Sequence, residues 1–581
     1  MKDIVATLLD QSVVDRGAAE RIRALAAEGK SLDEALLEGA GLPEDALLRR
    51  LAAEFGVPYV DLEATPPSKD FLSRFPARVL LKHRLLPLQG PGGVTLAVSS
   101  RLFDRSGADE LRLLSGVEFR PALAPSGEID RCIKNCLGVG ADTMQTLVSD
   151  AAEGEVQVVE QQDEDGVNLV EGAEDASIIR FVNQVLTEAI ERRATDVHIE
   201  PFERELRVRY RIDGMLQEAA IPAEVRHFQA EIVSRLKILS HLDIAEKRLP
   251  QDGRIKLRIA EREIDVRVSV IPMLHGEAVV LRLLDRSAAL LGLEQLGMSE
   301  RDRNTLEKVL EMPHGIVLVT GPTGSGKTTT LYAALSRIND VERKIITIED
   351  PIEYHLRGIN QIQVSAKAGL SFARGLRSIL RHDPDVILIG EIRDGETAEI
   401  AVQASLTGHL VFSTLHTNDA PGAAVRLIDM GIDPYLVASS LEAVMAQRLV
   451  RTICPQCKEA FEPPGVEELR AEMGELAPKA FYHGVGCRNC QGTGYRGRTC
   501  ILELMPVTEG VRRLILRRAS GGEIRQVAIR EGMKTLREDG WRHVGLGRTT
   551  AEEVLRATKD ERVAPVNESE ALSPPDDRGA S

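Results

Sequence analysis

Aromatic side chains, cysteines and long apolar runs are all scarce in this chain of 581 residues. Aromatic residues make up 3%, and 89 acidic residues outnumber 73 basic ones, which gives a net charge of −16. A protein that coats nucleic acid or anionic lipid needs a basic surface, and one that threads a single strand combines basic with aromatic side chains. The composition therefore argues against a nucleic-acid translocase and predicts no nucleic-acid partner.

No stretch of eighteen apolar residues occurs, and the opening residues, MKDIVATLLDQSVVDRG, lack the basic and then apolar order of an export signal. We therefore expect a cytoplasmic protein. Seven cysteines are too few for a disulfide scaffold in a chain of this length. Four of them instead form two CxxC pairs, which is a spacing typical of metal ligands.

Residues 321–328 read GPTGSGKT, a complete GxxxxGK[ST] phosphate loop, and the apolar run GIVLVT before it predicts the strand that such a loop follows. Glycines let backbone N–H groups turn toward phosphate oxygens, and a helix beginning at Lys327 directs its positive dipole end at them. Lys327 would hold the β and γ phosphates of ATP or GTP, and the Thr328 hydroxyl would bind Mg²⁺. The predicted nucleotide-binding residues are Gly321, Pro322, Thr323, Gly324, Ser325, Gly326, Lys327, Thr328 and Thr329.

Around this loop, apolar strands alternate with helical segments, which predicts a parallel sheet with ligands at the carboxyl ends of its strands. The length predicts three or four domains at about 150 residues each, and the fold class is α/β multidomain. Between Ala151 and Ser177 there are nine acidic residues and no lysine or arginine, as in a solvated linker. The predicted divisions are a small N-terminal α/β domain (1–150), this acidic linker (151–177), a second α/β domain (178–285), a connector (286–300), the nucleotide-binding core (301–450), a tetracysteine subdomain (451–500), a helical part (501–562) and a disordered tail (563–581).

Hydrolysis needs acidic groups near the terminal phosphate, and two candidate groups follow predicted strands. Glu391 comes directly after the buried run VILI and a glycine, where a Walker B acid would support Mg²⁺ or its water. Glu349, Asp350 and Glu353 follow the strand IITI, and Pro351 would hold these carboxylates at its tip. The alternative is that the acids only cap the next helix or pair with arginines.

These motifs resemble those of the secretion ATPase superfamily, with a close match to the assembly ATPases of bacterial type II secretion and type IV pili. The resemblance spans about residues 178–560 and also rests on ATDVHIEP, RYRIDG, RLPQDGRI, ILRHDPDVILIGEIRD and GHLVFSTLHTNDA. It implies a RecA-like core preceded by a PAS-like domain, with ATP as substrate. It also implies a homohexamer that docks through its first domain on an inner-membrane platform protein and is peripherally associated with that membrane.

The resemblance further assigns functions and residues. The chain would hydrolyse ATP to power pseudopilus assembly in type II secretion, or alternatively pilus extension; a nucleotide-gated scaffold with little hydrolysis is a third hypothesis. Glu349, Asp350 and Glu353 would form the family's Asp box, Glu391 would be its Walker B glutamate, and His409 and His416 would bound its His box. Arginines of the second domain would reach the nucleotide, although alternating arginines also occur on a solvated strand face. The candidate arginines are Arg209, Arg211, Arg254 and Arg267.

The two CxxC pairs predict a closed structural Zn²⁺ site, because two thiolate pairs supply four tetrahedral ligands and leave no position for substrate. Its ligands would be Cys454, Cys457, Cys487 and Cys490. Disulfide pairing is the alternative, and the cytoplasm disfavours it. Many assembly ATPases of the resembled group carry such an element, whereas retraction ATPases typically do not. Cys132, Cys136 and Cys500 are interpreted as core thiols.

The first domain matches the family more weakly. Some relatives bind cyclic di-GMP there through paired segments that begin RLG. This chain has Lys30, Ser31, Leu32 and Asp33 at the second candidate position, and the first lacks the triplet too. We therefore predict no binding of cyclic di-GMP.

Overall fold

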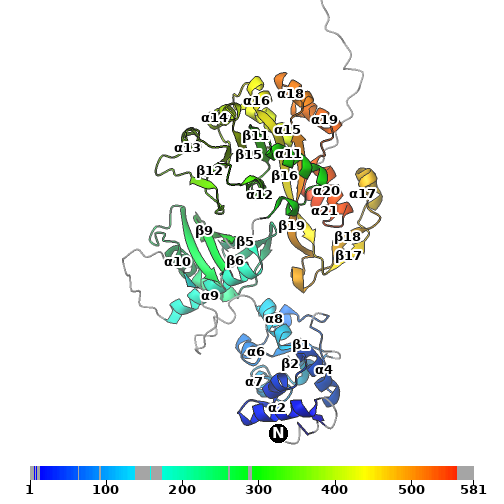
Figure 1. The fold of residues 1–581 in the computed structure, drawn as a ribbon. Coiled ribbons are helices and arrows are strands. Elements are labelled where there is room, and N and C mark those ends of the chain that lie inside the picture. The colour runs from blue at the N-terminus through cyan, green and yellow to red at the C-terminus, as the bar shows by residue number, and fades with distance from the viewer. Residues whose placement is uncertain are drawn as a thin grey trace, which may run out of the picture. The chain divides into compact units, whose positions relative to one another are not determined.

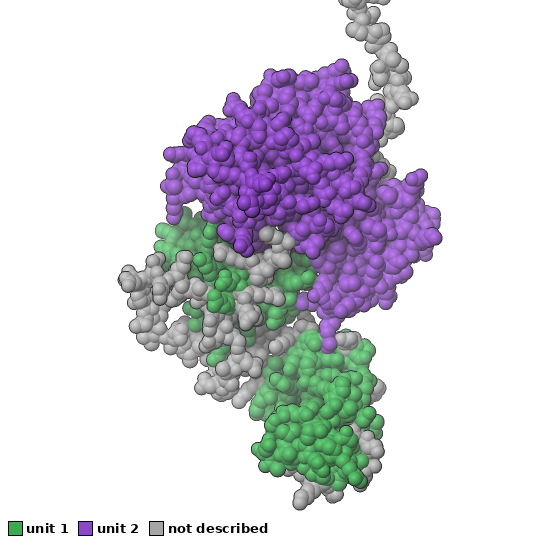
Figure 2. All heavy atoms as spheres, in the orientation of Figure 1, with its two compact units in different colours: residues 1–287 green, residues 288–581 purple. Residues whose placement is uncertain are grey.

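The computed structural model describes residues 5–6, 8–9, 14–137 apart from 63, 73, 91 and 92, the pair 157–158, and 173–558 apart from 260–261 and 286–290. The chain forms two compact units, Met1–Ser287 and Ala288–Ser581, which Figure 2 distinguishes by colour. Most of the predicted acidic linker and all of the predicted tail lie outside the described residues. The domain boundaries given above stay predictions.

The first unit begins with a group of short helices, α2 (Arg16–Ala27), α3 (Leu32–Gly39) and α4 (Glu44–Phe55). A three-stranded sheet follows, in which β2 pairs antiparallel with β1 and parallel with β3. The buried carboxylate of Asp33 accepts hydrogen bonds from the backbone N–H groups of Leu102 and Asp104, at 2.8 and 2.9 Å. This contact ties α3 to the loop after β2. The remaining elements of this region are α5 (Lys69–Leu72), α6 (Ala77–His83), β1 (Leu86–Gln89), β2 (Thr95–Ser99), α7 (Ser106–Ser115), β3 (Phe119–Leu123) and α8 (Ser126–Leu137).

The second sheet of this unit is antiparallel, with the strand order β4-β8-β9-β10-β5-β6-β7. Alternating apolar side chains of its strands are buried against α9 and α10, as expected for a sheet with one face packed and one face free. This alternation leaves the polar and charged side chains on the other face. The elements are β4 (Gln157–Val158), α9 (Ala173–Glu191), β5 (Ala194–Pro201), β6 (Leu206–Ile212), β7 (Met215–Glu218), η3 (Ala223–Phe228), α10 (Gln229–Leu239), β8 (Gln251–Ile259), β9 (Arg262–Met273) and β10 (Gly276–Asp285).

The second unit is built on a seven-stranded sheet with the order β13-β12-β14-β15-β11-β16-β19, seen among the green to orange elements of Figure 1. All neighbouring strands are parallel except β16 and β19. Its strands are β11 (Gly315–Thr320), β12 (Ile345–Glu349), β13 (Asn360–Gln363), β14 (Val386–Ile389), β15 (Leu410–Leu415), β16 (Leu441–Ile453) and β19 (Tyr495–Pro506).

Helices cover both faces of this sheet, because its inner strands are apolar on both sides. In β11, Ile316 and Leu318 belong to one core, while Val317 and Val319 belong to the other. The first core is closed by α13 (Phe372–Ile379), α14 (Gly395–Leu406), α15 (Ala420–Asp429), α16 (Pro434–Ser440), α18 (Glu509–Leu516) and α19 (Gly521–Arg530). The second is closed by η4 (Leu293–Leu296), α11 (Glu300–Leu310) and α12 (Lys327–Ile338).

A smaller substructure is inserted between β16 and β19 and packs on the last helices. It contains β17 (Lys458–Phe461), α17 (Val466–Met473), η5 (Gly474–Leu476), β18 (Phe481–Gly484) and η6 (Arg488–Cys490), and the chain ends its described part in α20 (Leu536–Gly545) and α21 (Ala551–Ala557). Among the described residues, no helix is long and apolar enough to cross a membrane. The mixed α/β class predicted from the sequence is confirmed.

Candidate nucleotide site

The phosphate loop lies between β11 and α12, as the sequence predicts. Gly326 precedes α12 with a φ of +90°, a conformation that glycine adopts without steric cost. The first turn of α12 has no acidic residue, and no side chain caps it. Its N–H groups and dipole are therefore available to an anion.

Lys327 lies against this loop, where its Nζ donates to the carbonyl oxygens of Gly321 and Pro322 at 2.8 and 3.2 Å. Burial lowers the pKa of Lys327, and the nearby Glu391 carboxylate opposes that shift. The hydroxyl oxygen of Ser325 is buried in the loop and has no hydrogen-bond partner in the structure. Three features of the loop fit the phosphates of a nucleotide. They are the ammonium of Lys327, which contacts neutral carbonyl oxygens, the unbonded hydroxyl of Ser325, and the uncapped N-terminus of α12.

Glu391 follows β14 at the same edge of the sheet, because β11, β14 and β15 are parallel. Its carboxylate is paired with Arg393, and its Oε2 lies 3.0 Å from Nε2 of His416, just after β15. Burial raises the pKa of Glu391, but the hydrogen bonds from Arg393 and His416 outweigh it and hold that pKa below its ordinary value. A carboxylate with a lowered pKa is ionised at neutral pH and is a weak base, which suits Glu391 to orient water or a metal ion better than to remove a proton.

The three acids at the end of β12 and just after it lie in different environments. Glu349 is buried, where it accepts hydrogen bonds from Tyr332, from Thr347 Oγ1 at 2.5 Å and from Gln361 Nε2 at 3.2 Å. Burial, together with this carboxylate, raises the pKa of Tyr332, so the phenol stays a donor. Asp350 is exposed, and Glu353 is half-buried.

Asp350 acts electrostatically on Arg393, the partner of Glu391. Asp350 thus lies toward the ion pair of Glu391 and Arg393, whereas the buried Glu349 contacts Tyr332 of α12.

His409 and His416 stand at opposite ends of β15. The Nδ1 of His409 lies 2.8 Å from the carbonyl oxygen of Ala404, and His409 precedes the strand, at the edge away from the phosphate loop. A six-residue strand spans roughly 20 Å at about 3.3 Å per residue. Of the two histidines, this unit brings only His416 to the loop.

The charged face of the second sheet holds a row of arginines in direct cross-strand register. Arg254 of β8 pairs with Arg267 of β9, which pairs with Arg282 of β10. The row continues through Asp196 of β5 to Arg211 of β6. Asp196 pairs with Arg282 at 3.1 Å and with Arg211 at 3.7 Å. The four arginines still outnumber this one acid, so an added anion would stabilise the row.

Arg254, Arg267 and Arg282 line an open cavity of about 390 Å³ together with Asp252 and Ser269. Two of the four predicted arginines are therefore neighbours there. Arg211 belongs to the same row and donates to the carbonyl oxygen of Gly214 at 3.1 Å.

Arg209 is engaged elsewhere, in a two-bond ion pair with Glu200 at 2.7 and 2.8 Å. Arg282 was not among the predicted residues, although its position in β10 between the core residues Leu281 and Leu283 was a signal for the charged face, because strand side chains alternate.

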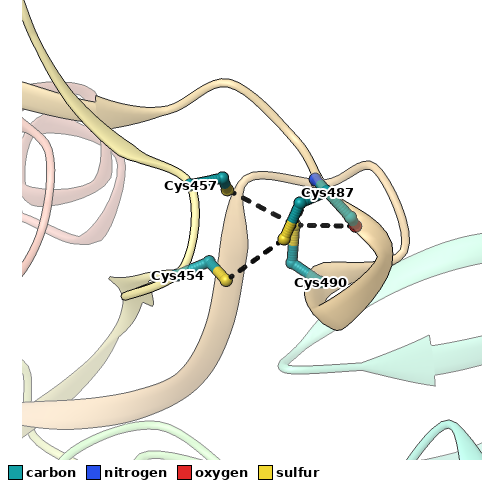
Figure 3. Close-up of side chains that lie close together, drawn as sticks. All are labelled: Cys454, Cys457, Cys487 and Cys490. Atoms are coloured by element: carbon teal, nitrogen blue, oxygen red, sulfur yellow. Dashed lines mark hydrogen bonds between the residues drawn. The ribbon is translucent and has the colours of Figure 1, made fainter. Parts of the chain in front are cut away.

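The four predicted cysteine ligands come together in the inserted substructure. Figure 3 shows Cys454 and Cys457 from one segment facing Cys487 and Cys490 from another. Their sulfur atoms all lie within 4.8 Å of one another, with separations of 3.7 and 3.8 Å between pairs. A tetrahedral ion with metal–sulfur bonds of about 2.3 Å requires sulfur separations of about 3.8 Å. The donor set therefore fits one closed metal site, and all four thiols are free of disulfides.

Fold and site together define a nucleotide-binding protein of the phosphate-loop class, with a parallel core sheet and an acid–histidine pair facing the loop lysine. Residues 171–556 match the family model described as "Type II/IV secretion system protein". The chain belongs to this family, and within it to the type II secretion and type IV pilus assembly ATPases. Residues 55–142 match the model described as "MshEN domain".

Two relatives and two solved structures are among those similar to the chain. The type II secretion system protein E of Pseudomonas aeruginosa is 55% identical over 70% of this chain and 79% of its own length. The type IV pilus assembly ATPase PilB of Myxococcus xanthus is 42% identical over 92% and 94%. The structure of the pilus retraction motor PilT with bound ADP is 28% identical, covers 65% and 96%, and has a TM-score of 0.44. A structure of MshE with cdg is 20% identical, covers 22% and 95%, and has a TM-score of 0.21.

Proposed function

We propose that this protein is an ATPase motor that hydrolyses ATP to ADP and phosphate to power pseudopilus assembly in type II secretion. The observation that carries the proposal is the placement of Lys327, Glu391 and His416 at one edge of the core sheet. Family membership and the identity to type II secretion protein E support it.

A second candidate is pilus extension, because the relative named as a pilus assembly ATPase matches 92% of the chain.

In this proposal each group has one task. The phosphate loop and Lys327 bind the β and γ phosphates of ATP, and Thr328 with Glu391 holds Mg²⁺, which supplies charge neutralisation when it is bound. Glu391 and Asp350 orient the attacking water, and His416 fixes the Glu391 carboxylate. The remaining Asp-box acids, Glu349 and Glu353, support the loop after β12.

The arginine row of the second domain supplies positive charge to the transferring phosphoryl group. A cationic group of this kind contributes about 10³-fold or more to phosphoryl transfer where it has been established. Arg254, Arg267 and Arg282 are the members that line one cavity. We propose this role for them in preference to Arg209 because they line the cavity and Arg209 does not; Arg209 pairs with Glu200, just as Arg282 pairs with Asp196.

We further propose a homohexamer that works at the cytoplasmic face of the inner membrane and docks on a membrane-platform protein through its first domain. The test is steady-state ATP hydrolysis by the purified chain across protein concentration, alone and with the cytoplasmic domain of the platform partner. Turnover per chain that rises with assembly or partner supports the motor. Tight ATP binding without turnover under every condition would favour the nucleotide-gated scaffold.

The cysteine cluster is proposed to hold Zn²⁺ as a structural ion. Cys487→Ser is expected to reduce bound zinc from about one equivalent per chain to less than about 0.1, because three thiolates no longer close the site. Metal analysis by mass spectrometry of the purified protein measures this directly. Cys132→Ser, in the first unit, serves as the control and should retain its zinc. Full zinc in Cys487→Ser would contradict a four-thiolate site.

We expect no binding of cyclic di-GMP to the first domain. The position that carries the binding triplet in some relatives here includes Asp33, whose carboxylate is buried and bonded to backbone N–H groups of Leu102 and Asp104. Isothermal titration of the full chain with cyclic di-GMP should show no saturable heat. Titration with ATP provides the positive control, and saturable binding of the cyclic dinucleotide would refute the prediction.

A further inference from the structure

Strand β16 is longer than its parallel neighbour β11 and continues beside the phosphate loop. Their register pairs Thr320, the last residue of β11, with Ala446, and β16 extends seven residues further to Ile453. Gln447 and Arg448 therefore stand next to the loop itself. A Cβ added at Gly321 would lie 2.6 Å from the carbonyl oxygen of Gln447 and 3.1 Å from Nη1 of Arg448.

Gln447 fastens the loop from this side. Its side chain is fully buried, with Nε2 donating to the carbonyl oxygen of Ser325 at 2.8 Å and Oε1 accepting from the hydroxyl of Thr330 at 2.7 Å. One amide thus connects β16 to the phosphate loop and to the first turns of α12. It also excludes a side chain at Gly326, because a Cβ there would lie 2.7 Å from Nε2.

Arg448 connects β16 with the segment after β15, next to the phosphate loop. Its Nη1 donates to the carbonyl oxygen of Gln447 at 2.9 Å, and its Nη2 donates to the carbonyl oxygen of Asn418 at 2.9 Å. The bond to Gln447 holds the guanidinium on its own strand, β16, while the bond to Asn418 reaches across to the segment after β15. A lysine carries one point of attachment and does not reproduce this planar fork.

The bridged segment, His416–Asp419, is the one that holds the Walker B glutamate. His416 contacts Glu391, and the backbone N–H of Thr417 donates to Thr320 Oγ1 at 2.9 Å. On its far side, Asp419 is paired with Arg525 of α19 at 2.6 Å. Every residue of the segment thus has a partner on a different element, and Arg448 supplies the partner on β16.

We propose that Arg448 is a positioning residue for hydrolysis, which keeps the His416–Asp419 segment against β16, beside the phosphate loop that Gln447 bonds, and so keeps His416 on Glu391. The inference deepens the proposed function and rests on it, since the reaction being positioned is ATP hydrolysis. Arg448 acts through its hydrogen bonds to neighbouring segments.

The first experiment compares Arg448→Lys with the wild-type full chain in kcat, KM and binding of a fluorescent ATP analogue. Loss of positioning by about an ångström costs on the order of 10²-fold in rate, so kcat should fall about 10-fold to 100-fold. Because the phosphate loop and Lys327 remain, the Kd for the analogue should change by less than about threefold. Arg337→Lys, exposed near the end of α12, is the matched control and should keep wild-type kcat.

Wild-type kcat in Arg448→Lys, or a loss of binding as large as the loss of kcat, would overturn the proposal. Wild-type kcat would mean that only the positive charge of Arg448 matters. An equal loss of binding would mean that Arg448 takes part in binding the nucleotide. Arg448→Gln, which is shorter and neutral, is the second variant if the lysine variant does not fold, and it should show the same division between kcat and Kd.

A second readout is independent of turnover. Hydrogen exchange of the Thr417 amide should become at least about tenfold faster in Arg448→Lys, because local opening of the segment is no longer opposed by the guanidinium. Unchanged exchange overturns the positioning role. If the wild-type chain hydrolyses no ATP, the proposed function fails, while this exchange measurement still decides whether Arg448 holds the segment.

Discussion

Glu391→Gln is expected to lower the rate of ATP turnover by about 10²-fold to 10³-fold, the usual cost of removing one preorganised electrostatic group from a catalytic site. Glutamine keeps the shape of the side chain but carries no charge for Mg²⁺ or water. Its amide nitrogen would also face Arg393, which now donates to the carboxylate. Nucleotide affinity should stay within about threefold, because the phosphate loop is untouched.

Single-turnover hydrolysis and titration with a fluorescent ATP analogue measure the two quantities separately. Glu399→Gln, exposed on α14, is the matched control and should retain full turnover. Retained hydrolysis in Glu391→Gln would move the metal or water role to another acid, with Asp350 the next candidate because it acts electrostatically on Arg393.

Lys327→Ala is expected to weaken nucleotide binding and hydrolysis together. Hydrogen bonds to charged groups contribute about 1.5–3 kcal/mol each, so affinity should fall roughly 10-fold to 100-fold. The ammonium also neutralises charge that develops during transfer, so turnover at saturating ATP should fall as well. Equilibrium binding and steady-state hydrolysis test both effects.

Lys308→Ala, exposed in the last turn of α11, is the control for loss of a lysine charge and should behave as the wild type. Unchanged affinity in Lys327→Ala would mean that the loop binds its ligand in another manner. The two variants together distinguish an ATPase motor from a nucleotide-gated scaffold. A motor is expected to lose turnover in both variants. A scaffold hydrolyses little ATP to begin with, so Glu391→Gln would change its turnover little.

Local motifs were readable from the sequence because all of their residues lie close together in the chain. The phosphate loop is eight consecutive residues after an apolar strand, and β11 and α12 border it as predicted. Glu391 follows a run of four apolar residues, which forms the buried strand β14. The CxxC pairs carried a recognisable spacing, and the four thiols meet in the structure.

Strand pairing between distant segments gave the positions of the candidate arginines and histidines, which the sequence left open. The candidate arginines could not be ranked until the register of β8, β9 and β10 aligned Arg254, Arg267 and Arg282. In the same way, the direction of β15 separates His409 from His416, because only one end of a parallel strand reaches the phosphate loop.

What the sequence by itself determined is the chemistry: a phosphate loop, an acid after a buried strand, and four thiolate ligands. What only the tertiary structure decided is which of the candidate side chains lie together. Glu349 is buried next to α12, where Tyr332 donates a hydrogen bond to it. Arg448 lies beside the phosphate loop because β16 extends beyond the end of β11. Both depend on how far neighbouring strands and helices extend beside one another, and packing between distant segments sets that extent.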